Sequence, residues 1–500
     1  MGIKAHIIRP IAKAAAIKVA YDANNAIENQ EKIFKYLIKT AQECEFGKDH
    51  RFSKITSYRK FKEQVPVRDY EALSFYMDRL LKGEKNLFWP GRPIYLAKTS
   101  GTTSGVKYIP ITKESAPYHV KSARDAVFCY INENKACSIM DGKLIFLSGS
   151  PVLSKKYGMH VGRLSGIVNH LIPWWLKLSQ VPSYKTNCIE DWEEKVEAIT
   201  HETHQVDLRM ISGIPAWVQM YFEKLLQKTG KKSIIEIFPN FKLFIYGGVN
   251  YEPYRNKIET LIGKKIPSLE TYPASEGFFA FQNSQKDNGL LLLTNNGIFY
   301  EFIKADEYFE PNPKRITLAN VELGVNYAMI ISTNAGLWAY SIGDTVKFVS
   351  KNPYKIIVTG RIKHFISAFG EHVISEETEA AIKDACNELN SEITEFHVAP
   401  QVAPQNGELP YHEWFIEFSK APENLPQFAS KIDEVMCKKN IYYKDLIEGK
   451  ILQKAKITVV AKDTFRNYMK SEGKLGGQNK LPRLANDRIL ADKLTALQPK

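Results

Sequence analysis

The chain has 500 residues, of which 44% are hydrophobic and 25% are charged, and this composition is typical of a folded globular protein. Its length predicts two to four folding units of roughly 100–200 residues each. The formal net charge is +13, but the excess lies entirely in residues 1–360, with no long basic run and no basic–aromatic RNA-binding signature, so we do not expect nucleic acid as a partner.

The six cysteines are scattered along the chain, with no CxxC pair and no short-spaced framework. This usage is typical of a reducing compartment. It argues against a disulfide scaffold and against a cysteine zinc site.

The first 20 residues contain Lys4, Arg9, Lys13 and Lys18 and no acidic residue. Because lysines interrupt the apolar run, it fits neither a secretory signal nor a membrane span. We expect an amphipathic docking helix, with an organelle transit peptide as the alternative. The protein is therefore expected to be cytoplasmic, without a membrane partner.

Strand and helix patterns alternate through the first half of the chain. One or two helices are predicted over 11–45, and a loop followed by a helix over 64–82. Further helices are predicted at 113–133, 216–228 and 252–262, and strands at Lys143–Leu147, Leu208–Ser212 and Phe241–Tyr246. This alternation predicts an α/β fold with parallel strands.

The pattern changes in the second half of the chain. Closely spaced strands with Asn/Gly turns predict antiparallel structure at Gly289–Leu293, Ile298–Ile303, Tyr327–Ser332, Trp338–Tyr340 and Val346–Val349. A smaller α/β unit follows, with helices at 375–390, 424–438 and 463–470 and strands at 411–418 and 455–460. We therefore predict a large N-terminal domain, residues 1–360, and a small mobile C-terminal domain, residues 361–500.

A polar loop, Lys98–Lys107, lies between the apolar strands predicted at Pro93–Leu96 and Tyr108–Ile111. It contains two glycines, five hydroxyl residues and a lysine at each end. Glycines allow close approach to an anion, hydroxyls donate hydrogen bonds and lysine supplies charge, so the loop is suited to phosphate. It is not a Walker loop, and a merely flexible Ser/Thr/Gly loop is the alternative.

An apolar strand, Phe241–Tyr246, runs into the glycine pair Gly247-Gly248. Ligands of α/β sheets bind at such strand ends, and glycines let a flat ring lie against the backbone. An ordinary strand-end turn is the alternative for this motif.

The stretch Glu270–Gly277 places Tyr272, Ser275 and Glu276 within five residues. Tyr272 could stack on a base, and Glu276 could hold magnesium on phosphates. A surface turn with a solvated glutamate is the alternative.

Two later stretches carry further candidate residues. Gly336–Asp344 is predicted to end a strand in Gly-Asp, where a fixed carboxylate could accept ribose hydroxyls, although Gly-Asp is also ordinary hairpin chemistry. Gly473–Arg483 is a glycine-rich basic loop that could carry Lys480 into a site on the first domain when the domains close, or be only a mobile tail.

Together these stretches resemble the adenylate-forming superfamily of acyl-CoA ligases, firefly luciferase and peptide-synthetase adenylation domains. The matching segments are the phosphate loop Thr99–Lys107, the adenine wall Tyr246–Gly248, the tyrosine–glutamate motif Tyr272–Glu276, the ribose-binding Asp344 and the hinge Gly360–His364. Ile109–Thr112, Gly336–Asp344 and Gln478–Arg483 resemble the Gretchen Hagen 3 family of acyl acid amido synthetases most closely.

The resemblance implies an ATP- and magnesium-dependent enzyme that activates a small carboxylic acid as its acyl adenylate and transfers it to an amine, typically an amino acid. A positive field around such anionic substrates accounts for the net charge. The implied roles are phosphate binding by Ser100, Gly101, Thr102, Thr103 and Lys107; adenine binding by Gly247, Gly248 and Tyr272; nucleotide binding by Ser275; magnesium binding by Glu276; ribose binding by Asp344; nucleotide contact at the hinge by Arg361; and α-phosphate neutralisation by Lys480.

Some features depart from the family pattern or leave alternatives open. His364 stands where the ligases have an acidic hinge residue, and the acyl-pocket residues of plant members do not transfer to this shorter chain. The aromatic stretches 157–176 and 214–217 could line an acyl site or pack in the core. The competing functions are an acyl-CoA ligase and a non-catalytic nucleotide or acyl-acid binding protein.

Overall fold

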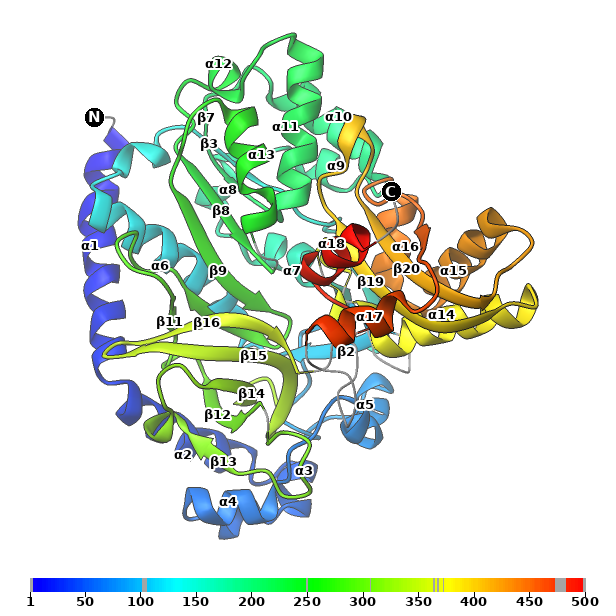
Figure 1. The fold of residues 1–500 in the computed structure, drawn as a ribbon. Helices are drawn as coiled ribbons and strands as arrows, with labels where there is room; N and C mark the ends of the chain where they lie inside the picture. The colour runs from blue at the N-terminus through cyan, green and yellow to red at the C-terminus, as the bar shows by residue number, and fades with distance from the viewer. Residues whose placement is uncertain are drawn as a thin grey trace.

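The computed structural model describes residues 3–100, 106–248, 251–305, 307–362, 365–366, 368–371, 373–472 and 483–497. Within this part of the chain the fold is mixed α/β, with one large sheet and a smaller C-terminal sheet (Figure 1). The parallel and antiparallel halves predicted from the sequence are thus joined in a single sheet. That sheet has 12 strands in the order β13-β12-β14-β15-β16-β11-β10-β9-β8-β7-β3-β6.

The helices have the following bounds: α1 (Ile3–Asn24), α2 (Ala26–Ala41), α3 (Glu45–Asp49), α4 (Tyr58–Gln64), α5 (Ser74–Leu81), α6 (Ala116–Asn134), α7 (Leu164–Leu171), α8 (Trp174–Lys177), α9 (Tyr184–Asn187), α10 (Trp192–Thr203), α11 (Pro215–Thr229), α12 (Ile234–Ile237), α13 (Glu252–Ile262), α14 (Ser375–Glu388), α15 (Leu425–Lys439), α16 (Ile441–Glu448), α17 (Thr464–Ser471) and α18 (Ile489–Ala496).

The strands have the following bounds: β1 (Tyr95–Ser100), β2 (Val106–Ile111), β3 (Lys143–Phe146), β4 (Ser154–Lys156), β5 (Met159–Arg163), β6 (Gln180–Val181), β7 (Leu208–Ser212), β8 (Leu243–Gly247), β9 (Ser268–Ala274), β10 (Gly277–Phe281), β11 (Leu290–Leu292), β12 (Ile298–Lys304), β13 (Arg315–Thr317), β14 (Asn326–Thr333), β15 (Tyr340–Lys351), β16 (Tyr354–Arg361), β17 (Phe365–Ile366), β18 (Val373–Ile374), β19 (Glu392–Gln401), β20 (Tyr411–Lys420) and β21 (Lys456–Val459).

The parallel half of the large sheet is covered on both faces. Neighbouring residues of β7 show this, since Met210 packs in the core on the side of α1 and α6, whereas Ile211 packs in the core formed with α11. Successive side chains of a strand point to opposite faces, so both must be apolar in a doubly covered sheet. This explains the near-continuous apolar sequence of β8, and Figure 1 shows α11 and α13 lying over β7 and β8.

The antiparallel half differs from the sequence prediction at β15. The separate strands predicted at Trp338–Tyr340 and Val346–Val349 belong to one stretch, in which β15 runs continuously over Tyr340–Lys351. The prediction that a strand ends at Gly343-Asp344 is therefore wrong. Gly343 has φ +84° and lies inside the strand, where a bulge takes the place of the predicted turn.

A separate sheet carries the polar loop. Its strand order is β2-β1-β5-β4, with β1 antiparallel to β2 and parallel to β5. Figure 1 shows β2 of this hairpin next to α17 of the C-terminal unit.

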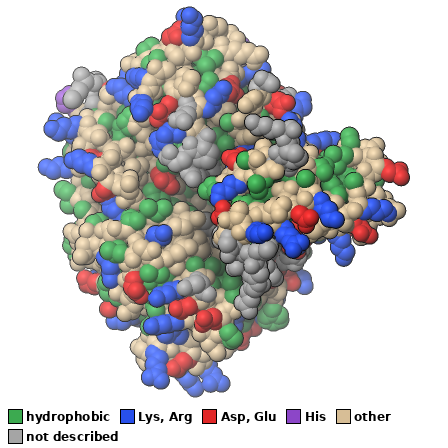
Figure 2. Space-filling view, in the orientation of Figure 1, with side chains coloured by type: hydrophobic (Ala, Val, Ile, Leu, Met, Phe, Trp, Pro, Cys, Tyr) green, Lys and Arg blue, Asp and Glu red, His purple; other side chains and the backbone are tan. Residues whose placement is uncertain are grey.

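The C-terminal unit protrudes from one side of the molecule (Figures 1 and 2). Its sheet has the order β19-β20-β21. The helices α14, α15 and α17 and the strands β20 and β21 lie where the sequence predicted them, but β19, α16 and α18 were not predicted. Helix α16 is short and follows α15 after Asn440, and this residue caps it by accepting from the Tyr443 N–H at 2.9 Å.

The exterior does not show a single basic surface on the face drawn in Figure 2, where Lys and Arg side chains are interspersed with Asp and Glu. All six cysteines are unpaired thiols. Among the described helices, none has both the length and the apolar character needed to cross a membrane.

Candidate functional site

The hairpin β1–β2 brings the two ends of the polar loop together. Thr99 is opposite Lys107, and Ser100 is opposite Val106, so both strands extend further into the motif than the sequence predicted. Gly101, Thr102 and Thr103 lie outside the described residues. Strand pairing therefore continues up to the loop and holds its two ends side by side.

Lys107 projects from β2 toward the ring of Tyr70. Its ammonium nitrogen lies 5.5 Å from the centroid of that ring. The Tyr70 hydroxyl in turn accepts a hydrogen bond from the Tyr108 N–H at 3.0 Å. A cation–π contact thus stabilises Lys107 beside the loop.

The glycine pair lies at the end of β8. A side chain on Gly247 would place Cβ 2.4 Å from the Thr271 carbonyl oxygen of β9, which is too close for any residue but glycine. Gly248 has φ +81°, and a Cβ there would meet no atom of the described residues within 4 Å. The strand end is therefore tightly packed on one side and open on the other.

Tyr272, Ser275 and Glu276 belong to one β-hairpin. Ala274 of β9 pairs with Gly277 of β10, so Ser275 and Glu276 form the turn between the strands. Tyr272 is 7% exposed and lies in β9, with its ring edge-on to Phe279 at 5.0 Å. The local structure of this motif is therefore a turn, and Glu276 is a partly buried residue within it.

Asp344 contacts Tyr272 directly, although 72 residues separate them in the sequence. The Tyr272 hydroxyl donates to Asp344 Oδ2 at 2.6 Å. In β15, the residues Ile342, Gly343 and Asp344 lie opposite Met329 alone, because Thr345 pairs with Ala328 and Ser341 with Ile330. Such a bulge redirects a side chain, and here the redirected carboxylate meets β9.

Arg361 is the register partner of Asp344 across β15 and β16. The main chain confirms this adjacency, since the Ile362 N–H donates to the Gly343 carbonyl oxygen at 2.8 Å. The antiparallel pairing therefore places the backbone of Arg361 directly beside the ribose-binding candidate. Lys480 lies outside the described residues.

Helix α16 of the C-terminal unit contacts the start of the polar loop. The Tyr442 hydroxyl donates to the Lys98 carbonyl oxygen at 2.6 Å. Burial raises the pKa of Tyr442, and the negative charge of Glu276 raises it further. The positive charge of Arg163 and a hydrogen bond with Thr99 lower this pKa and so oppose the shift. Tyr442 thus lies among the loop, the β9–β10 turn and Arg163, which links residues that the sequence motifs left separate.

Two charged residues at this contact were missed by sequence reasoning. Arg163, at the end of β5, forms an ion pair with Asp445 of α16. Its guanidinium also lies 5.1 Å from the centroid of the Tyr442 ring. No spacing rule connects residues on an unpredicted strand and an unpredicted helix, so this pairing requires the tertiary structure.

The donor set beside the loop fits magnesium held on a nucleotide. Among the described residues no group of three His, Cys, Asp or Glu side chains could form a metal cage. Magnesium characteristically takes only one or two carboxylates and completes its shell with phosphate oxygens and water. A single carboxylate, Glu276, near a hydroxyl-rich loop matches that requirement.

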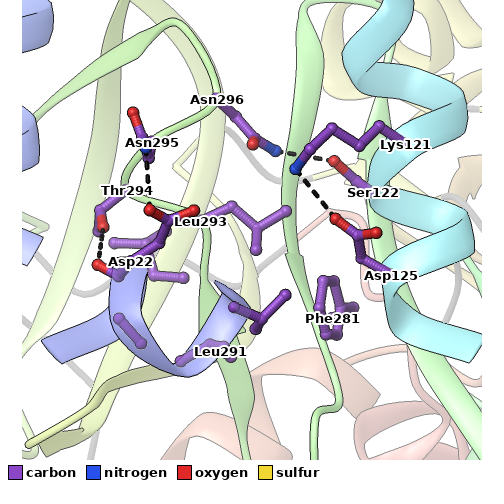
Figure 3. Close-up of a pocket in the computed structure, with 13 residues that line it drawn as sticks. Asp22, Lys121, Ser122, Asp125, Phe281, Leu291, Leu293, Thr294, Asn295 and Asn296 are labelled. Carbon is purple, nitrogen blue, oxygen red and sulfur yellow. Dashed lines mark hydrogen bonds and ion pairs between the residues drawn. The ribbon is translucent and has the colours of Figure 1, made fainter. Parts of the chain in front are cut away.

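A small cavity lies away from these residues, between α1, α6 and residues 291–296 (Figure 3). Asp22 lines one side and accepts from Asn295 at 3.0 Å, and Asp125 lines the other and accepts from Lys121 at 2.9 Å. Its volume of about 20 Å³ is room for one or two water molecules. This cavity is too small for a substrate.

The aromatic stretches have mixed environments. Met159 and Ile167 are buried in the core, whereas Trp174 is 76% exposed. Trp217 packs on Trp192 with ring centroids 4.7 Å apart. For Met159, Ile167 and Trp217, core packing is the interpretation that the structure supports.

Replacing Asp344 tests the ribose role. A carboxylate can accept about four hydrogen bonds, so the bond from Tyr272 is compatible with nucleotide binding. We expect Asp344→Ala to weaken ATP binding by about 10- to 150-fold, because hydrogen bonds to a charged group are lost. Titration calorimetry measures this, with Tyr272→Phe as the control that removes only the tyrosine bond. Unchanged ATP affinity in Asp344→Ala would contradict the role.

Sequence models of one protein family match most of the chain. The GH3 family N-terminal domain matches residues 17–167 and 150–267, the GH3 family central domain matches 291–361, and the GH3 family C-terminal domain matches 376–489. The chain belongs to the GH3 family. This match confirms the sequence resemblance to the family. GH3 acyl acid amido synthetases are ATP-using ligases of the adenylating type.

Two relatives among GH3 proteins are jasmonoyl–L-amino acid synthetases of Nicotiana attenuata. JAR4 is 23% identical over 385 residues, covering 64% of this chain, and JAR6 is 23% identical over 393 residues, also covering 64%. The chain spans 66% of the length of each relative.

Solved structures share the fold along nearly the whole chain. An acyl acid amido synthetase, AtGH3.15 in complex with 2,4-DB, has a TM-score of 0.61 at 16% identity and covers 97% of this chain and 96% of its own. A 2-hydroxyisobutyryl-CoA ligase in complex with 2-HIB-AMP and CoA has a TM-score of 0.54 at 14% identity and covers 95% of this chain and 93% of its own. At these identities the likeness concerns the fold alone.

Proposed function

We propose that this GH3 protein is an ATP-dependent acyl acid amido synthetase. It adenylates a small carboxylic acid, releasing pyrophosphate, and transfers the acyl group to an amine, for which an amino acid is the best candidate. The observation that carries this proposal is the 2.6 Å bond between Tyr272 and Asp344, which joins two distant family motifs at one site. Family membership and the synthetases among its relatives support the same reaction.

The chemistry requires activation because a carboxylate is a poor electrophile. Its oxygen attacks the α-phosphorus of ATP, the bond to the pyrophosphate oxygen breaks, and the acid becomes a mixed anhydride with AMP. The amine nitrogen then attacks the acyl carbon, AMP leaves and the nitrogen loses a proton. Such reactions depend on positioning and charge stabilisation rather than on a protein nucleophile.

The roles proposed for the nucleotide-binding residues are those that the resemblance to the family implies. Ser100, Gly101, Thr102, Thr103 and Lys107 bind the β- and γ-phosphates. Gly247, Gly248 and Tyr272 bind adenine, and Ser275 contributes to nucleotide binding. Asp344 binds ribose, with Arg361 beside it. Glu276 would hold magnesium, which neutralises phosphate charge when bound.

The two domains have different roles in the proposed reaction. In the proposal, residues 1–360 bind ATP and the acid, and residues 361–500 form a lid. Lys480 enters on the lid and neutralises charge at the α-phosphate. The contact of α16 with the Lys98 carbonyl is compatible with such a lid, since it shows that the C-terminal unit reaches the start of the loop.

Carboxylate-dependent exchange of labelled pyrophosphate into ATP tests the first step. A broad panel of small acids is supplied one at a time with ATP and magnesium. We expect exchange with at least one acid and none without acid. Silence across the whole panel, with intact ATP binding, would favour the non-catalytic alternative.

An acyl-CoA ligase remains the second candidate because the fold is shared with a 2-hydroxyisobutyryl-CoA ligase. Both candidates form the same adenylate and differ only in the acceptor. The acceptor therefore has to be identified separately from the exchange reaction.

A further inference from the structure

The contact between α16 and β5 neutralises a cation beside the polar loop. Arg163 is the register partner of Lys98 across β5 and β1, so it is placed where the loop begins. Its side chain and that of Asp445 are each 33% exposed, and the two form an ion pair across the domains. Opposite charges at such a contact stabilise the docked arrangement of the two units that the structure shows.

Tyr442 adds two interactions to the same contact. Its hydroxyl donates to the Lys98 carbonyl oxygen at 2.6 Å, and its ring lies beneath the Arg163 guanidinium at 5.1 Å. Planar guanidinium groups stack on aromatic rings and also bind phosphate in a bidentate manner. In this structure the Arg163 guanidinium stacks on the Tyr442 ring.

The Arg163 side chain packs against the backbone near the end of β3. A Cβ on Gly149 would lie 3.3 Å from Arg163 Cδ, so the arginine side chain lies close over the glycine that follows β3. Burial lowers the pKa of the guanidinium, and the nearby Tyr442 and Glu190 oppose that effect. A partly desolvated cation of this kind needs an anionic partner, which Asp445 supplies here.

Hydrogen bonds attach helix α16 to the rest of the C-terminal unit. Asn440, which caps the helix, donates to the Glu371 carbonyl oxygen at 2.9 Å, and Glu371 accepts from the buried His412 at 2.8 Å. The Tyr443 hydroxyl donates to Asp433 of α15 at 2.5 Å. Rotation of the C-terminal unit would therefore withdraw Tyr442 and Asp445 together.

We propose that Tyr442 and Asp445 form a latch over a phosphate-binding residue, Arg163, and that a phosphate group of ATP takes the place of the Asp445 carboxylate when the latch opens. The proposal rests on the proposed function for its ligand, since ATP is the anion that the adjacent loop would hold. Asp445 and the phosphate compete for one guanidinium, so closing the latch lowers the apparent affinity for ATP.

ATP affinity in four variants tests the latch. We expect Asp445→Asn to tighten ATP binding by about two- to fivefold, the range that release of one partly exposed ion pair allows. Arg163→Gln should weaken ATP binding by about tenfold or more. Adding Asp445→Asn to Arg163→Gln should then bring no gain. The matched control is Glu448→Gln, which removes a charge from the same helix at a position paired with Lys444 at 3.5 Å.

Hydrogen exchange of the peptide 441–448 provides a readout that needs no turnover. We expect ATP with magnesium to speed exchange in the wild type, and Asp445→Asn to speed it without ATP. Equal ATP affinities in Asp445→Asn, Glu448→Gln and wild type, or wild-type affinity in Arg163→Gln, would overturn the proposal. If no acid supports pyrophosphate exchange while these affinities change as expected, the proposed reaction fails and the latch stands.

Discussion

We expect Lys480→Ala to lower carboxylate-dependent pyrophosphate exchange by about 100- to 1,000-fold while ATP still binds. In the proposed mechanism this lysine reaches the site only when the C-terminal unit closes for adenylation. It then neutralises charge that grows on the α-phosphate in the transition state. Losing one such preorganised group costs about 3–4 kcal/mol of transition-state stabilisation.

The neighbouring lysine of the same glycine-rich segment, Lys474, provides the matched control. Lys474→Ala removes an equal charge and should leave the exchange rate within about twofold of wild type, because the proposed mechanism assigns Lys474 no contact with the reacting atoms. Initial exchange rates at saturating ATP are compared across the variants. Unchanged exchange in Lys480→Ala would remove this residue from the mechanism.

We expect Arg315→Met to destabilise the folded protein by about 3–5 kcal/mol. Arg315 Nε lies 2.8 Å from Glu301 Oε1, and the two side chains are only 5% and 0% exposed. Removing the arginine leaves a buried carboxylate without its counter-charge. Urea unfolding followed by tryptophan fluorescence at pH 7 measures the shift in midpoint.

The pH dependence of this variant has a defined sign. Burial already raises the pKa of Glu301, and Arg315 opposes that effect. Without Arg315 the pKa rises further, so above the unfolded-state value of about 4.3 the folded variant holds a proton that the unfolded chain has released. Its free energy of unfolding therefore falls as pH rises through this window.

The loss should accordingly be smaller at pH 5 than at pH 7. The double variant Arg315→Met/Glu301→Leu should recover most of the stability, because replacing both partners by apolar residues leaves no buried charge. Equal losses for the single and double variants would show that packing, and not charge, dominates at this position.

Much of the fold is predictable from local patterns. The helix predicted at 252–262 and the strand predicted at Leu208–Ser212 have the observed bounds, because uninterrupted apolar periodicity and flanking breakers define them. The mixed large sheet was harder to foresee. Residues 338–349 read as two strands because Gly343-Asp344 has turn chemistry, and only pairing with both β14 and β16 keeps β15 continuous.

Some residues of the candidate site were predictable from the sequence and others were not. Motif order predicted Tyr272 and Asp344 as ligands of one nucleotide, and the structure places them in contact. Arg163 and Tyr442 carry no such signal, since each lies in an element that the sequence pattern did not reveal. Their contact depends on how the C-terminal unit docks, which is a property of the tertiary structure alone.

Identification of the acceptor tests the central claim most directly. The protein is incubated with ATP, magnesium and an acid that supports exchange, with either an amino acid mixture or coenzyme A, and the products are identified by mass spectrometry. We expect an N-acyl amino acid formed in equal amount with AMP and pyrophosphate. AMP release that requires coenzyme A and yields an acyl thioester, with no amide from any amino acid, would contradict the assignment as an amido synthetase.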